Sequence, residues 1–170
     1  ASNEFEEPWM DEGINSFSEF RYWRTKYLGK KLSVLFFENE KTGRLVNLNR
    51  FPYGKFYETM YLLPARMRLD QPMDLHSEDY TLINYGGILY QKSALAFTYL
   101  MDYLGEDTFN TAMQSFFREW QYKHPGPDDL RRAFETHTGK DLTWFFDRLI
   151  PTTGRIDYAG SLLYSFSLIA

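Results

Sequence analysis

Two acidic side chains near the start of the chain have a spacing that a metal site could use. Glu12 and Glu19 are seven residues apart, close to two helical turns, so both carboxylates lie on one face of a helix with Asn15 and Ser16 between them. One carboxylate could bind a metal ion while the other holds the free ring nitrogen of a ligating histidine. A solvated acidic face is the competing interpretation, and the spacing alone favours it.

The three histidines of the chain do not complete such a site. His76, His124 and His137 lack the i, i+4 spacing of an HExxH helix, and no glutamate stands directly beside the first of them. We interpret them as surface or turn histidines. The chain has no cysteine, so a metal site must use His, Asp or Glu. Catalytic zinc normally has three protein ligands, and this chain offers one.

Three segments resemble one enzyme family, the gluzincin zinc aminopeptidases of peptidase family M1, which include aminopeptidase N and leukotriene hydrolase. WMDEGINSFSEF resembles the WLNEGFASYxE motif, and YQKS, beginning at Tyr90 and continuing to LGEDTF, resembles the YxKG or YxKP motif. Ser93 departs from the usual glycine or proline. DLRRAFETHTGKDLTWFFDRLI resembles the end of the family's catalytic domain. The resemblance covers about residues 4–28 and 80–158, and residues 31–79 are a candidate insertion.

The resemblance implies a role for each matching residue. Glu12 matches the third zinc ligand of the family, and Glu19 matches the acid that supports the metal site. Tyr90 matches the tyrosine that donates a hydrogen bond to the tetrahedral oxyanion while zinc polarises the carbonyl. Tyr85 is a neighbour that could share this role, and Asp11 stands where the family usually has asparagine. For a tyrosine without this context, core packing would be the ordinary interpretation.

The resemblance also implies what is missing. In the family an HExxH helix supplies two zinc histidines and the general base, and its second histidine lies nineteen positions before the glutamate that Glu12 matches. Only eleven residues precede Glu12. We therefore expect a C-terminal part of a catalytic domain that hydrolyses N-terminal peptide bonds of peptide substrates. It would be inactive alone, would bind Zn²⁺ weakly or not at all, and would need the HExxH part of the same polypeptide as its partner. A non-catalytic helical interaction module derived from the same scaffold is the alternative.

The elements that would position these residues are mainly helical. Apolar spacing predicts a helix from Pro8 to Leu28, and residues 88–104 are apolar almost all round and followed by Gly105, as expected for a central buried helix. Residues 31–48 resemble two strands around a turn, with a helix as the close competitor. Further helices are expected at about 54–63, 107–122, 129–136 and 142–149, with an irregular loop over 64–80.

These elements fit the helical C-terminal lobe of a thermolysin-like metallopeptidase catalytic domain, with a candidate small β-hairpin insertion. We assign residues 1–158 to that domain and 159–170 to a following segment or a truncated tail. The chain opens on polar residues directly against a motif and ends in the apolar run SLLYSFSLIA. We therefore expect it to be part of a longer polypeptide.

Composition excludes several other classes. With 170 residues, 44% of them hydrophobic, the chain can bury one sizeable core. Its net charge of -4 and the lack of a basic run argue against nucleic-acid binding. No apolar stretch approaches the ~18 residues of a membrane span. GxGxxG, P-loop and GxSxG motifs are absent, so nucleotide-binding and serine-hydrolase interpretations have no support.

Overall fold

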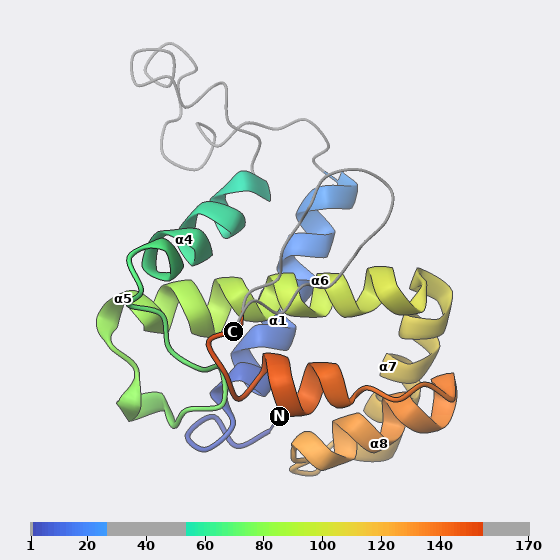
Figure 1. Cartoon of the computed structure of the whole chain (residues 1–170). Helices are drawn as coiled ribbons and strands as arrows, with labels where there is room; N and C mark the ends of the chain where they lie inside the picture. The colour runs from blue at the N-terminus through green and yellow to red at the C-terminus, as the bar shows by residue number, and fades with distance from the viewer. Residues whose placement is uncertain (1, 27–53, 155–170) are drawn as a thin grey trace.

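The computed structural model describes residues 2–26 and 54–154, and within these ranges it contains helices and connecting loops but no strand (Figure 1). The prediction of a mainly helical chain is confirmed. The two residues at the end of the first predicted helix, the candidate hairpin and the segment 159–170 lie outside the described residues. The helices are α1 (Pro8–Lys26), α4 (Gly54–Arg66), η2 (Ser77–Asp79), α5 (Leu82–Asn84), η3 (Tyr85–Lys92), α6 (Ser93–Leu104), α7 (Glu106–Trp120), α8 (Pro127–Thr138) and η4 (Trp144–Leu149).

The core is built around α6, which follows α5 and η3 without a break and crosses the middle of the molecule (Figure 1). Every residue from Ser93 to Met101 is buried, which confirms the predicted central helix. The fully buried ring of Phe97 stacks on Trp9 with centroids 6.0 Å apart, and it lies 5.9 Å from Phe17 and 5.8 Å from Phe145. Aromatic contacts of this kind therefore join α1, α6 and η4 in one core.

The helix boundaries follow local backbone chemistry. Gly105 has φ of +84°, a conformation that suits glycine, and it separates α6 from α7 at the predicted position. The helix α8 begins at Pro127, earlier than predicted, because proline suits a first helical position and the preceding Gly126 N–H donates to Asp129 Oδ2 at 3.0 Å.

The predicted boundary at Pro64 was wrong, because α4 continues through this proline to Arg66. A proline removes the donor that the carbonyl four residues earlier would use, here that of Met60. The Met60 oxygen faces Gly87 instead, lying 2.8 Å from the position that a Cβ on Gly87 would take. The absence of that Cβ lets η3 pack directly against this turn. The stretch from Met67 to Tyr80 is irregular as predicted, apart from the short turn η2.

Hydrogen bonds tie this irregular stretch to both ends of the described chain. Ser77 N–H donates to Phe5 O at 3.0 Å, and Met73 N–H donates to Ile150 O at 2.9 Å. The buried Tyr80 hydroxyl donates to Met73 O at 2.6 Å. None of the described helices combines the length and apolar character that a membrane crossing requires.

Candidate active site

The helix α1 carries the two predicted carboxylates on its less buried side. Its buried residues include Met10, Gly13 and Phe17, which pack toward the core, while Glu12 is half-buried and Glu19 is exposed. Asp11, directly before Glu12, is also half-buried. The apolar positions of α1 therefore fix the helix against α6 and leave the Glu12 carboxylate at the edge of the core.

The segment η3 is a π-helix, and this geometry brings the two predicted tyrosines together. Tyr85 and Tyr90 are five residues apart, which in an α-helix would place them about 140° apart around the axis. A π-helix links residues i and i+5 by hydrogen bonds, so the two side chains lie on the same side. Their ring centroids are 5.8 Å apart. The π-helix was not predicted from the sequence, although the five-residue spacing and Gly86-Gly87 between the tyrosines were visible there.

The Glu12 carboxylate lies close enough to the phenol of Tyr90 to act on its pKa. Burial raises the pKa of Tyr90 well above its ordinary value, and a hydrogen bond to Glu12 and the negative charge of that carboxylate raise it further. Tyr85 adds a smaller contribution of the same sign. A tyrosine in this setting stays protonated at neutral pH and can act as a hydrogen-bond donor. The structure thus brings together Glu12, Tyr90 and Tyr85, three of the residues singled out in the sequence.

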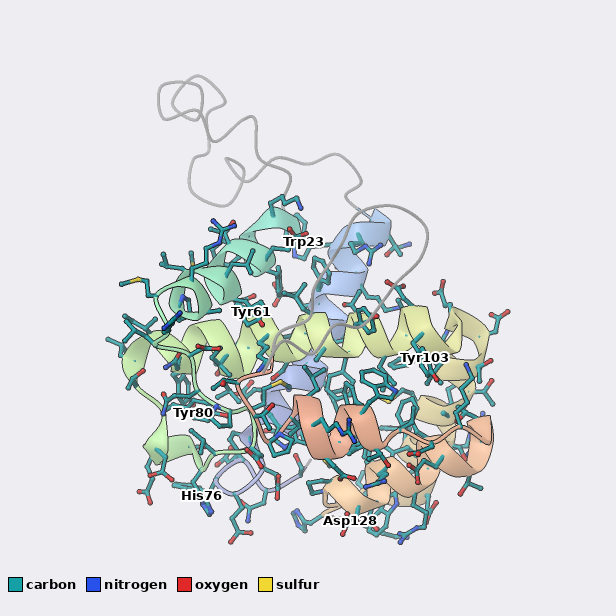
Figure 2. All side chains as sticks on the ribbon, in the orientation of Figure 1. Trp23, Tyr61, His76, Tyr80, Tyr103 and Asp128 are labelled. Carbon is teal, nitrogen blue, oxygen red and sulfur yellow. The ribbon has the colours of Figure 1, made fainter. Side chains whose placement is uncertain are left out.

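A buried lysine two residues after Tyr90 was not singled out in the sequence. Lys92 has no exposed surface, its Nζ donates to Thr152 O at 3.1 Å, and it lies 6.0 Å from the ring centroid of Tyr61. Burial lowers its pKa to about 8, although Asp70 and Asp74 act in the opposite direction. Figure 2 shows the labelled Tyr61 close to the continuous helical segment formed by η3 and α6. The sequence did carry a signal for it, since Lys92 is the lysine of the YQKS segment that resembles the YxKG motif.

The histidines do not join the carboxylates. His76, His124 and His137 are all exposed, and His137 Nδ1 lies 2.9 Å from Ala133 O. Within residues 2–26 and 54–154, no group of three or more His, Cys, Asp or Glu side chains is arranged to hold a metal ion. The Glu12 carboxylate has the chemistry of a single zinc ligand, since Asp and Glu oxygens bind zinc in proteins. These residues therefore fit one part of a zinc site.

A groove of about 430 Å³ lies between α1 and α7 and is separate from these residues. Arg21 lines it from α1, together with Phe17. Arg21 is nine residues after Glu12, which places it on the opposite side of a helix. The groove therefore opens on the other face of α1 from the Glu12 carboxylate.

Comparison with known proteins identifies a family whose model covers most of the chain. The family model described as the peptidase family M1 domain matches residues 2–149. Over 72 residues the chain is 35% identical to aminopeptidase N of Streptomyces lividans, a match that covers 42% of this chain and 8% of that protein. The chain thus spans a small part of the length of this curated relative. No solved structure matches the chain. The family match extends over most of the sequence and includes Glu12, Tyr85 and Tyr90. On this evidence the chain belongs to peptidase family M1.

Proposed function

We propose that this chain is part of the catalytic domain of a zinc aminopeptidase, in which Glu12 binds the metal and Tyr90 stabilises the oxyanion of the reaction. The observation that carries the proposal is that the Glu12 carboxylate lies close enough to the Tyr90 phenol to raise its pKa. These groups come from distant parts of the sequence and from different helices, α1 and η3. A zinc ligand and an oxyanion donor must lie side by side, because both act on the same carbonyl group.

Each residue would contribute one part of the chemistry. The chemistry that zinc would supply when bound is polarisation of the scissile carbonyl and activation of a water molecule. Glu12 would supply one carboxylate oxygen to the metal, and Glu19 would orient a ligating histidine through its second ring nitrogen. Tyr90 holds its proton because its pKa is raised, so its hydroxyl can donate to the developing oxyanion. Tyr85, which lies beside Tyr90, would keep that hydroxyl oriented.

The remaining groups of the site would come from the same polypeptide outside this sequence. The chain contains no HExxH, which in the resemblance drawn above supplies two histidine ligands and the general base. We expect the coding sequence upstream to encode an HExxH whose second histidine falls nineteen residues before Glu12. Its absence from the complete gene would favour the non-catalytic interaction module instead.

Two substitutions in the full-length protein test the assigned roles. Glu12→Gln should abolish zinc retention, measured as metal content after dialysis, because a neutral amide is a poor zinc ligand. Tyr90→Phe should keep the zinc and lower kcat by roughly 10²- to 10³-fold, the usual effect of removing one oxyanion donor. Tyr122→Phe is the matched control, since this side chain is 99% exposed. Wild-type activity in both site variants would refute the proposed function.

The isolated chain provides a separate test. With one carboxylate ligand it should show no peptide hydrolysis and only weak zinc binding by isothermal titration calorimetry. Stoichiometric tight binding of zinc by the purified chain would contradict the proposed division of the site between this chain and an upstream helix.

A further inference from the structure

The helix α1 touches the junction of η3 and α6 through a residue with no side chain. Gly13 is buried, and a Cβ placed on it would lie 2.6 Å from Ser93 Cβ and 3.3 Å from Ser93 Oγ. The next atom, Leu89 O, is 3.8 Å away, an ordinary contact distance. The backbone of α1 therefore rests directly on the side chain of Ser93.

This contact lies beside the proposed catalytic groups on both helices. Gly13 directly follows Glu12, and Ser93 is three residues after Tyr90. A change in the distance between Gly13 and Ser93 therefore moves Glu12 relative to Tyr90. Only a short helical segment joins Gly13 to Glu12 and Ser93 to Tyr90.

Ser93 also closes the π-helix that aligns the two tyrosines. It is fully buried, its backbone N–H donates to Ile88 O, and its Oγ donates to the same oxygen at 3.3 Å. The bond to a carbonyl five residues earlier is the π-helical pattern. The side chain that supports α1 thus stands at the end of the turn that carries Tyr85 and Tyr90.

We propose that Ser93 is a positioning residue that sets the distance between the Glu12 carboxylate and the Tyr90 phenol through its contact with Gly13. The proposal rests on the proposed function for its catalytic consequence, whereas the contact itself belongs to the described structure. The Cβ of Ser93 is the spacer, and its hydroxyl serves the π-helix. The Oγ, 3.3 Å from the position of a Cβ on Gly13, adds a looser contact of the same kind.

Adding a methyl group at Gly13 and removing the side chain of Ser93 tests the contact in this chain. Gly13→Ala requires the helices to separate by about 0.8 Å, from 2.6 Å to the 3.4 Å of ordinary contact. It should lower the melting temperature by roughly 2 to 10 °C in a far-UV circular dichroism melt. In the Ser93→Gly background the same substitution should lower it far less, since Leu89 O at 3.8 Å leaves room for the methyl group.

Two controls separate this contact from other effects. Ser93→Ala keeps the Cβ at 2.6 Å and removes only the Oγ at 3.3 Å, so in that background Gly13→Ala should be nearly as destabilising as in the wild type. Gly86→Ala adds the same methyl group where no atom lies within 4 Å, and it should not lower the melting temperature. Equal destabilisation by Gly13→Ala in the wild-type and Ser93→Gly backgrounds would overturn the proposed contact.

Kinetics of the full-length protein test the positioning role. Gly13→Ala should lower kcat roughly 10- to 100-fold with KM changed less than about twofold, because a displacement of this size disturbs the catalytic geometry. Gly13→Ala combined with Ser93→Gly should recover most of kcat, although each substitution alone perturbs the helix. A general loss of stability predicts the opposite, with the double variant slowest.

The outcomes distinguish this proposal from the proposed function. If Glu12→Gln abolishes zinc retention but the double variant is as slow as Gly13→Ala, the positioning role of Ser93 is wrong and the proposed function stands. If Glu12→Gln retains zinc and activity, the proposed function is wrong, while the melting temperatures still report on the contact between Gly13 and Ser93.

Discussion

Replacing Lys92 with methionine should remove a pH dependence from the stability of this chain. The ammonium group is fully buried, donates to Thr152 O at 3.1 Å and lies 6.0 Å from the ring of Tyr61. Burial lowers its pKa from 10.5 to about 8, and the attraction of Asp70 and Asp74 offsets this only in part. The folded state therefore holds this proton less firmly than the unfolded state does.

The size and sign of the effect follow from this difference. Between about pH 8 and 10.5 the unfolded chain keeps the proton and the folded chain releases it, so the free energy of unfolding rises with pH. The full difference corresponds to about 3 kcal/mol, at about 1.4 kcal/mol per pH unit. Of this, about 2 kcal/mol should appear between about pH 8 and pH 10. Below pH 8 both states are protonated, so the contribution is flat.

Urea unfolding followed by far-UV circular dichroism measures this contribution at intervals from about pH 7 to pH 10. The series ends at about pH 10 because two tyrosines would oppose the effect above it. Burial raises the pKa of Tyr80 and Tyr90, so the unfolded chain loses these phenolic protons before the folded chain does, and the free energy of unfolding falls. The free energy of unfolding of the wild type minus that of Lys92→Met should rise by about 2 kcal/mol across this range. Parallel curves for the wild type and Lys92→Met would refute the reasoning.

Two further substitutions test the packing that supports the site. Phe97→Ala should lower the free energy of unfolding by about 3–5 kcal/mol in urea titrations, because the ring is fully buried against Trp9, and a loss below about 1 kcal/mol would contradict its central place. Gly87→Ala should lower the melting temperature by several degrees in calorimetry, because a methyl group there would lie 2.8 Å from Met60 O. Gly86→Ala, with no atom within 4 Å, should not lower it, and equal effects at the two glycines would argue against the close approach of α4.

Much of the helical architecture could be predicted because its signals are local. The all-round apolar run before Gly105 predicted a buried helix, and α6 is that helix. The error at Pro64 has a tertiary cause, since the proline is accommodated where Gly87 allows η3 to approach the Met60 carbonyl. A sequence window around residue 64 does not contain the glycine that makes this possible. Local rules predicted the helices, and long-range packing decided where one of them ended.

The site was less predictable from the residues alone. The spacing of Glu12 and Glu19 favoured an ordinary acidic face, and the family resemblance was needed to connect Glu12 with Tyr90. The proximity of Tyr85 and Tyr90 depends on a π-helix. Its number of residues per turn differs from that of the α-helix, the period by which helices are recognised in a sequence. The burial of Lys92 was unexpected because lysine is almost never fully buried.

Packing within the chain holds together the two helical segments that carry Glu12 and Tyr90. Gly13 and Ser93 are in direct contact, and the aromatic stack of Trp9 on Phe97 fixes the same two helices at a second point. Two contacts on one pair of helices constrain their rotation as well as their distance. If the proposed function holds, the metal would bind to a ligand that is already placed, and little ordering entropy would remain to oppose its binding. Glu12→Gln should then remove the metal from the full-length protein while leaving the melting temperature of the isolated chain nearly unchanged.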